Sequence, residues 1–486
     1  MLFNSIHFFI FILIVVPIFF ILPEKYQRLW IFLCSLYFYA VFQFIYVFLL
    51  LYSIGISYLS IYFITNLNQI KLKKLFLIIG IIGNLLLLLI FKYSVQLYDV
   101  LNFILGFEPC DKKYIQPPNI LLPMGISFFC LQAISAIVDI YRGIAEKPKN
   151  ILYFGLYLSF FPQLVAGPIL RTKDLLDQFY IEKRFDSNNF RNGLFQICLG
   201  YLKKTLIADQ ISPYVDQIFQ TPWEYHSISM WIAVYLFSLQ IYGDFSGYSD
   251  IAIGIARIMG FELPQNFNRP FFSKTMAEFW RRWHISFSSW LRDYIYIPLG
   301  GSRINTFRTY INLFLTMLIS GLWHGAGWNY LLWGALHGIF LLGERFLLSF
   351  KKIEQIGSKI PAFILSSIGI FYTYWVFSFT FFFFRAKPIV FPETNFTASS
   401  IEVAWYMVLR SIIPSPGKIV IPSLQYFVMI AILFFIEYLM ENQNKKNYIK
   451  RFIQSDYLYV FAGVILFTCL VIYSVSVSQP FVYFQF

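Results

Sequence analysis

Two histidines in strongly hydrophobic stretches are the first candidates for chemistry in this chain. His284 lies in the sequence Phe-Trp-Arg-Arg-Trp-His-Ile-Ser, and His324 lies in Leu-Trp-His-Gly-Ala-Gly. An ionisable side chain at membrane depth is costly to place there, so it more often marks a functional site than a scaffold. An imidazole in a dry cavity can act as a general base toward a hydroxyl group. The two histidines are therefore the leading candidates for catalytic residues.

The composition indicates an integral membrane protein. Of the 486 residues, 58% are apolar, 21% are aromatic and only 13% are charged, which exceeds what a soluble domain can bury. Apolar runs near the length of a spanning helix predict about 11 to 13 spans in one all-α polytopic domain. The first run lacks a basic flank and a small-residue cleavage site, so we expect a span rather than a signal peptide. The runs are 6–22, 28–66, 75–92, 121–141, 194–211, 228–260, 308–345, 361–384, 421–440 and 457–476.

Basic residues gather in the connections between these runs, and such loops are expected to be cytoplasmic. If successive loops alternate between the two sides of the membrane, the N-terminus and the last residues lie outside. This assignment depends on the number of crossings. The Gly, Pro and Asp residues of 151–169 and 244–260 leave open whether these segments cross or re-enter the membrane. The basic positions are Lys25, Arg28, Lys71, Lys73, Lys74, Arg142, Lys147, Lys149, Lys351, Lys352, Lys359, Lys445, Lys446, Lys450 and Arg451.

The net charge of +13 needs no nucleic acid as a partner, because anionic membrane lipids attract the basic loops. The five cysteines fall at no regular spacing. They indicate neither a disulfide framework nor a metal site.

The residues around His284 form a pattern of their own. On a helical wheel, 279–293 predicts one amphipathic helix with an aromatic face, and His284 falls at the edge of that face. Arg281, Ser288 and Arg292 lie with His284 along one strip of this helix. A cationic strip beside a histidine suits a ligand that carries phosphates. An interfacial helix whose arginines contact lipid phosphates explains the same pattern. The candidate donor-binding residues in and beside this strip are Arg281, Arg282, Ser288 and Arg292.

The segment around His324 predicts a different setting. Small residues surround the histidine, and glycines so close together favour a break between two apolar helices, which places His324 at a bend inside the membrane. A histidine hydrogen-bonded between packed helices is the alternative. His337 lies further along the second helix, so it can share the site only if the two helices fold against each other. The small residues are Ser320, Gly321, Gly325, Ala326 and Gly327.

Two aspartates are further candidates for supporting a base. Asp244 and Asp250 belong to Tyr-Gly-Asp-Phe-Ser-Gly-Tyr-Ser-Asp, and either could orient or couple to a histidine. Their spacing directs them to different faces of a helix, so we expect at least one to be structural. The sequence has no Gly-x-Ser-x-Gly elbow, no Gly-x-x-x-x-Gly-Lys loop and no His-Glu-x-x-His helix. A histidine base is the chemistry that remains.

Five motifs in order resemble the membrane-bound O-acyltransferase family, and above all its bacterial branch of alginate and peptidoglycan O-acetyltransferases. This resemblance implies a ring of tilted helices, with re-entrant and interfacial helices, around a central tunnel. It also implies that His324 is the catalytic residue and His284 its partner. The motifs occupy 162–169, 242–250, 279–286, 296–301 and 322–327.

The resemblance further implies one membrane domain over 1–486, in the bacterial cytoplasmic (inner) membrane. Acetyl-CoA is the implied donor, with no cofactor and no metal, and a polysaccharide is the acceptor through a separate periplasmic SGNH-type acetyltransferase. The parts of the domain are N-terminal helices 1–120, a catalytic core 121–345, C-terminal helices 346–478 and an aromatic tail 479–486.

The tail ends Phe-Val-Tyr-Phe-Gln-Phe and resembles a C-terminal motif of the same branch, in which the tyrosine accepts the acyl group. Tyr483 is therefore a candidate acyl carrier, although such a tail could also simply pack at the membrane interface. The predicted reaction is proton removal from an acceptor hydroxyl by His324 as the hydroxyl attacks acetyl-CoA. A transporter or flippase subunit and a non-catalytic scaffold are the alternatives from other functional classes.

Overall fold

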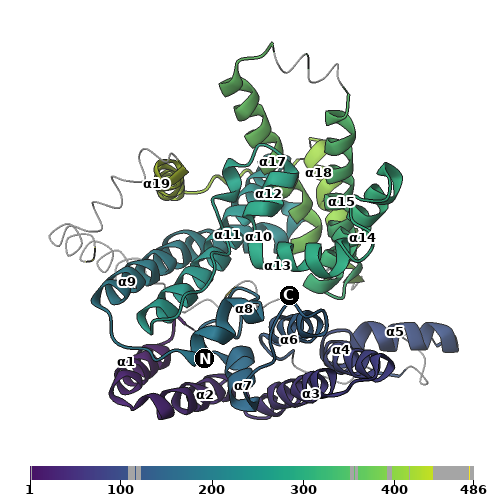
Figure 1. Ribbon diagram of the computed structural model, residues 1–486. Coiled ribbons are helices and arrows are strands. Elements are labelled where there is room, and N and C mark those ends of the chain that lie inside the picture. The colour runs from purple at the N-terminus through teal and green to yellow at the C-terminus, as the bar shows by residue number, and fades with distance from the viewer. Residues whose placement is uncertain are drawn as a thin grey trace. The chain divides into compact units, whose positions relative to one another are not determined.

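The structure is a computed structural model, and the regular structure that it describes is almost entirely helical (Figure 1). The only strands in the described part are β1 (Ile389–Val390) and β2 (Thr397–Ala398), which pair antiparallel. The described residues are 1, 3–107, 115, 116, 122–350, 355, 359–390, 397–414, 416–441, 463 and 481.

Five helices of the described part are long and apolar enough to cross a membrane. In the apolar stretch of 18 residues that defines each of these spans, only 28% of the residues of α4 and 22% of those of α15 are buried. The other apolar side chains are free to face lipid. The prediction of an all-α, multi-pass membrane protein is confirmed, while the number of about 11 to 13 spans stays a prediction. The five helices are α3 (Tyr46–Asn66), α4 (Ile70–Lys92), α11 (Ser227–Ile258), α15 (Trp328–Leu348) and α17 (Ala362–Arg385).

Shorter apolar helices accompany these five in the described part. They are α1 (Ile6–Ile21), α5 (Ser94–Leu105), α6 (Ile126–Tyr141) and most of α19 (Leu424–Glu441). The last predicted run, 457–476, lies outside the described residues except for Gly463.

The chain divides into two compact units. Unit 1 comprises Met1–Ile197 and Ser249–Gln265, and unit 2 comprises Cys198–Tyr248 and Asn266–Phe486. Both histidines of interest belong to unit 2.

Unit 1 is a helical bundle in which α3 packs against α4, α6 and α7 (Figure 1). Gly80 of α4 lies so close to α3 that an added Cβ would be 2.7 Å from Oγ of Ser60. Asn84 of α4 accepts a hydrogen bond from Ser53 (2.6 Å) and donates one to Ser57 (2.9 Å), both on α3. Small residues and interhelical hydrogen bonds are the usual means of joining helices in lipid. The other elements of this unit are α2 (Glu24–Ala40), α7 (Ile151–Ser159), α8 (Thr172–Leu175), the 3₁₀ segment η1 (Leu176–Tyr180) and most of α9 (Ser187–Leu202).

The two segments of open topology differ in structure. Helix α7 ends at Ser159, so its nine residues span only about 13 Å and cannot cross a membrane alone. The segment 244–260, by contrast, lies almost wholly inside the continuous helix α11 (Ser227–Ile258). Its glycines serve packing, because an added Cβ on Gly247 would lie 2.7 Å from the carbonyl oxygen of Gly200.

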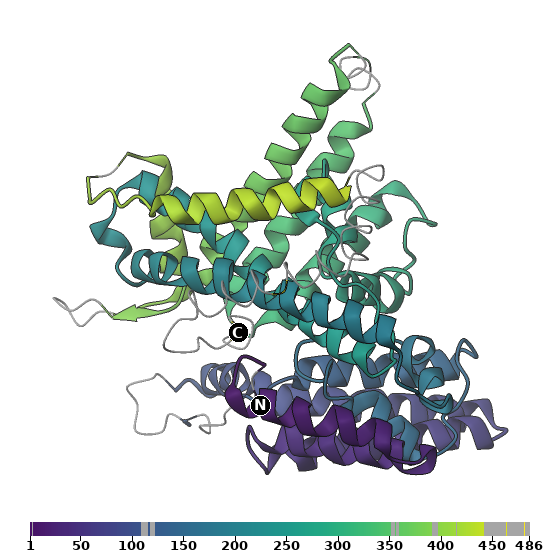
Figure 2. The same cartoon turned by 90° about the vertical axis from the view of Figure 1, so that its left-hand side faces the viewer.

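Unit 2 holds a helical hairpin of α14 (Thr306–His324) and α15. An added Cβ at Gly334 of α15 would lie 2.4 Å from the carbonyl oxygen of Met317 on α14, so the hairpin needs glycine at this crossing. Helix α15 also packs against α17. The long helix α19 is yellow-green in Figure 2, and it contacts the π-helical segment η2.

The remaining elements of unit 2 are short. The helices are α10 (Asp209–Gln220), α12 (Met276–Arg282), α13 (Ile285–Leu291) and α18 (Ser400–Ile412). The π-helical segments are η2 (Lys203–Ala208) and η5 (Arg292–Tyr296), and the 3₁₀ segments are η3 (Pro222–Glu224) and η4 (Pro270–Phe272).

Candidate active site

His284 lies at a break between two helices, not within one. Helix α12 ends at Arg282 and α13 begins at Ile285, so the predicted continuous helix over 279–293 is wrong. His284 adopts the left-handed conformation, with φ 43° and ψ 54°, which costs a non-glycine residue about 1–3 kcal/mol. The backbone N–H of Ile285 donates to the carbonyl of Asn266 (2.9 Å), which satisfies a group that a continuous helix would have paired internally.

Asn266 fixes the protonation of the His284 ring. Its Oδ1 accepts a hydrogen bond from the backbone N–H of Ser286 (3.2 Å), a group that can only donate, so the orientation of the amide is determined. The same Oδ1 faces Nδ1 of His284 at 3.3 Å, and Nδ1 must therefore carry the proton. Nε2 is then the basic nitrogen of this ring.

Burial keeps the His284 ring neutral. The residue is 1% exposed and lies outside the five candidate spans, and desolvation lowers the pKa of its imidazole to about 3. The ring is therefore uncharged at neutral pH.

His324 is the last residue of α14, and residues 325–327 separate it from α15, as the sequence predicted. An added Cβ at Gly325 would lie 2.3 Å from the ring of Tyr330, and one at Gly327 would lie 2.2 Å from Oδ1 of Asn329. The tight turn therefore requires glycine on steric grounds. His324 is 8% exposed.

The two histidines share one aromatic enclosure. Phe287 lies 5.1 Å from the ring of His284 and 5.8 Å from that of His324, measured between centroids. Trp323 likewise lies 5.9 Å from His284 and 4.9 Å from His324. The rings of Phe287 and Trp323 stack at 4.1 Å. Residues far apart in the sequence thus place two buried imidazoles in one largely aromatic site.

The hairpin brings His337 to the far side of this site. The ring of Trp333 lies 4.9 Å from His324 and 4.6 Å from His337. The sequence predicted that His337 can share the site of His324 only if the two helices fold against each other, and α14 and α15 do so. His337 is fully buried.

A family model for the membrane-bound O-acyltransferases matches residues 18–383. The chain belongs to this family. The probable alginate O-acetylase AlgI of Pseudomonas aeruginosa is 37% identical over 413 residues, which are 83% of this chain and 73% of that protein. The peptidoglycan O-acetyltransferase of Helicobacter pylori is 36% identical over 392 residues, 75% of this chain and 72% of that protein.

A more distant relative is the teichoic acid D-alanyltransferase of Bacillus subtilis, 28% identical over 284 residues, which are 56% of this chain and 71% of that protein. The chain is an acyltransferase, as the five motifs predicted, and the transporter and scaffold alternatives are set aside.

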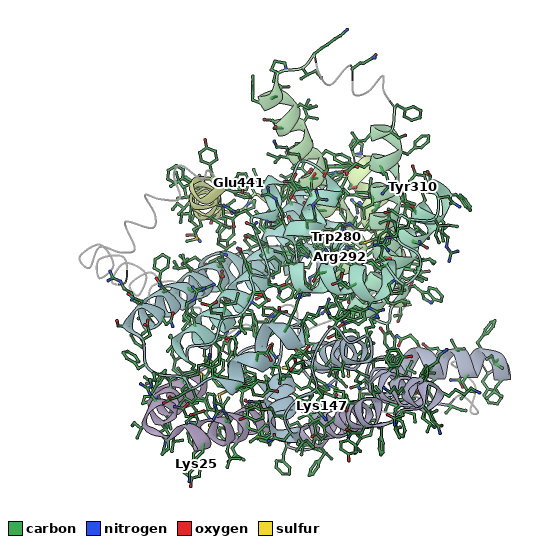
Figure 3. All side chains as sticks on the ribbon, viewed as in Figure 1. Lys25, Lys147, Trp280, Arg292, Tyr310 and Glu441 are labelled. Carbon is green, nitrogen blue, oxygen red and sulfur yellow. The ribbon has the colours of Figure 1, made fainter. Side chains whose placement is uncertain are left out.

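The arginines of this acyltransferase are less available than the helical wheel suggested. The guanidinium of Arg282 pairs with Glu278 (2.7 Å) and with Glu441 (3.0 Å), the residue that ends α19 and is labelled in Figure 3. Arg292 pairs with Asp293 at 2.8 Å, yet its side chain is 63% exposed. Such an exposed pair is weak, so Arg292 can exchange this partner for a phosphate. Arg281 is exposed, while Oγ of Ser288 donates to the carbonyl of Trp283 (3.1 Å).

One of the two aspartates is held in a buried ion cluster that sequence reasoning missed. The ammonium of Lys204 lies 2.6 Å from Asp244 and 2.9 Å from Asp209, and the three side chains are 8% exposed or less. Asp244 thus has a structural partner within the acyltransferase. Asp250 belongs to unit 1, where it accepts a hydrogen bond from Gln196 at 3.3 Å. The apolar surroundings of Lys204 in the sequence were the available signal, because a lysine in such a run needs a carboxylate partner.

Besides its two carboxylate partners, the Lys204 ammonium contacts an aromatic ring. Phe481 lies 4.5 Å from its Nζ, and the same ring lies 4.9 Å from that of Tyr248 on α11. Tyr248 and Phe245 stand one helical turn apart, and Phe245 packs against His284 at 4.7 Å. A residue of the predicted aromatic tail is thus bound close to the histidine site. The candidate carrier Tyr483 lies outside the described residues.

Proposed function

We propose that this acyltransferase transfers an acetyl group from acetyl-CoA toward the hydroxyl groups of an extracytoplasmic polysaccharide, with His324 as the general base. The observation that carries the proposal is the enclosure of His324 and His284 by Phe287 and Trp323. The relatives named for alginate and peptidoglycan O-acetylation support a polysaccharide as the acceptor.

The proposed step balances without a metal or ATP. The acceptor oxygen attacks the thioester carbonyl while its proton passes to His324, and a tetrahedral intermediate forms. The C–S bond then breaks, an ester remains on the acceptor, and the proton on His324 passes to the departing thiolate of coenzyme A. His284, with Nε2 as its basic nitrogen, orients the donor or takes part in the proton transfer through the same enclosure.

The donor is proposed to enter the site from the cytoplasm, and only its acetyl group crosses the bacterial inner membrane. Of the predicted arginines, Arg281 and Arg292 are best suited to meet its phosphates, because the carboxylates of Glu278 and Glu441 already occupy Arg282. A periplasmic SGNH-type acetyltransferase is the proposed partner that chooses the polymer.

Tyr483 is proposed to carry the acetyl group to that partner. The support is the anchoring of Phe481, a residue of the same tail, against Lys204 and Tyr248. The phenol of Tyr483 would serve first as acceptor and then as donor.

The direct test replaces His324 with Ala and measures transfer of radiolabelled acetyl from acetyl-CoA in membranes, at matched protein levels. Loss of a general base lowers the rate by about 10²- to 10⁴-fold. His7 on α1 in unit 1 is exposed, so His7→Ala is a matched control that should keep full activity. Unchanged transfer by the His324 variant would remove the assignment. For the carrier role, Tyr483→Phe should abolish polymer acetylation, and acetylation at the normal level would contradict it.

A further inference from the structure

Three buried rings form a cluster beside His324 that the proposed mechanism does not use. Trp280, Trp333 and His337 are 9%, 2% and 0% exposed, and each contacts the other two. The centroid distances are 5.1 Å from Trp280 to His337, 4.6 Å from Trp333 to His337 and 6.0 Å between the indoles. All three pairs meet edge to face. Trp280 is labelled in Figure 3, on α12.

Each ring presents a polar atom with no hydrogen-bond partner among the described residues. These atoms are Nε1 of Trp280, Nε1 of Trp333 and Nδ1 of His337. Buried polar groups are nearly always satisfied, so three such atoms on mutually contacting rings call for an explanation.

The hydrogen bonds around Thr380 determine which of these atoms accepts. The Thr380 hydroxyl donates its one hydrogen to the carbonyl of Phe377 at 2.8 Å. Its oxygen therefore accepts from Nε2 of His337, 3.1 Å away, and Nε2 carries the proton of that ring. Nδ1 of His337 is then an acceptor, whereas an indole nitrogen can only donate. The cluster offers two donors and one acceptor.

A single atom that meets all three groups is the oxygen of a hydroxyl group. The oxygen of a hydroxyl group has two lone pairs for the indole N–H groups and a hydrogen for Nδ1 of His337. A carbonyl oxygen or a carboxylate has no hydrogen to donate to Nδ1 of His337. A cation would be repelled by the two indole N–H groups, which point positive hydrogens toward it. Buried waters typically make about three hydrogen bonds, the number on offer here.

We propose that Trp280, Trp333 and His337 form a subsite that binds one hydroxyl oxygen directly behind His324. The oxygen belongs either to a resident water or to the acceptor that is to be acetylated. The second source rests on the proposed function, and it would make these residues positioning groups for the attacking hydroxyl. Trp333 connects the subsite to the site of reaction, because its ring contacts His324 as well.

Ultraviolet resonance Raman spectroscopy of the purified full chain tests the subsite, since one indole band reports hydrogen bonding of the N–H group. Difference spectra against Trp280→Phe and Trp333→Phe isolate the two indoles from the other tryptophans. Trp231→Phe is the matched control, because its Nε1 donates to the carbonyl of Ser411 at 3.1 Å. That control should show a hydrogen-bonded indole under all conditions.

Each Raman outcome decides a point. Two hydrogen-bonded indoles in the protein alone would identify a resident water if they persist in Tyr483→Phe, and the acceptor hydroxyl of Tyr483 if that variant loses them. Hydrogen bonds that appear only with an added mannuronate oligosaccharide or peptidoglycan fragment would identify the acceptor hydroxyl. Indoles without hydrogen bonds in both conditions would overturn the proposal. The Raman signal does not depend on catalysis. If His324→Ala proved fully active, the proposed function would be refuted, but the Raman experiment would still test the subsite.

Two replacements of His337 separate binding from mere packing. His337→Gln can keep a donor at the position of Nε2, facing Thr380, and loses the acceptor at Nδ1. His337→Asn can place an oxygen at the position of Nδ1 and loses the bond to Thr380. If a hydroxyl is bound, the Asn variant should retain about 5- to 10-fold more acetyl transfer per folded molecule than the Gln variant, as expected for one hydrogen bond. Equal rates, or a faster Gln variant, would refute the role of Nδ1.

Discussion

If His284 takes part in the reaction as proposed, replacing Asn266 with Ala should lower acetyl transfer by about 10- to 100-fold, the range seen when a group that orients a metal-ligating histidine is removed. In the structure, Oδ1 of Asn266 is the acceptor that holds the proton on Nδ1 of His284, at 3.3 Å. A hydrogen bond of about 1–3 kcal/mol favours that tautomer by roughly 5- to 150-fold. Without it, the ring can carry its proton on Nε2 and lose its basic nitrogen.

Ser286→Ala is the matched control for this variant. It removes the 2.9 Å bond from Oγ to the same Oδ1 but leaves the contacts of Oδ1 with the Ser286 N–H and with His284. We expect a loss of stability near 1 kcal/mol and at most about a twofold loss of rate. Asn266→Ala removes all three bonds, so its stability loss should be about 3 kcal/mol or more.

The assay is initial-rate transfer of labelled acetyl from acetyl-CoA in membranes, normalised to folded protein by size-exclusion chromatography in detergent. Because only Asn266→Ala releases the proton on Nδ1 of His284, we expect it to be at least several-fold slower per folded molecule than Ser286→Ala. Equal rates for the two variants would refute this role of Asn266, because the only contact to His284 that distinguishes them is the one to Nδ1.

Three further predictions concern the supports of unit 2. Lys204→Met should lower the free energy of unfolding by about 3–5 kcal/mol, because it leaves two buried carboxylates without their cation; thermal unfolding in detergent measures this. Phe481→Ala should slow polymer acetylation by roughly 10-fold while Phe481→Trp retains it, because the ring faces an ammonium; equal rates would argue against the anchor. Gly334→Val should reduce the yield of folded protein strongly, because its Cβ would meet a carbonyl oxygen at 2.4 Å, whereas Gly343→Val, with open space around it, should not.

The all-α, membrane-spanning architecture could be predicted from the sequence, because the length of an apolar run and its composition indicate a spanning helix without knowledge of its neighbours. The break after His324 could also be predicted, since the glycines there are required by nearby side chains of the following helix. The break at His284 could not, because it is imposed by Asn266, a residue of a separate loop whose carbonyl and side chain bind the junction. A helical wheel assumes a continuous helix, and the chain has none over 279–293.

Long-range pairing explains the other differences. Nothing local to Arg282 indicates that Glu441, on a distant helix, will occupy it. The glycines within 244–260 left open whether this segment crosses or re-enters the membrane, whereas Gly247 serves a close contact with the carbonyl oxygen of Gly200. In both cases the sequence correctly identified an unusual residue, and only the three-dimensional partner decided its role.

The backbone conformation of His284 argues that its side chain is needed where it stands. A left-handed residue between two helices is most easily a glycine or an asparagine, and a histidine there carries about 1–3 kcal/mol of strain. Packing alone does not require an imidazole, because a phenyl ring would fill an enclosure of Phe245, Phe287 and Trp323 equally well. What a phenyl ring lacks is a proton for Asn266 and a basic nitrogen on the opposite side. The strain at His284 therefore supports the proposed chemistry at Nε2, in the same enclosure as His324.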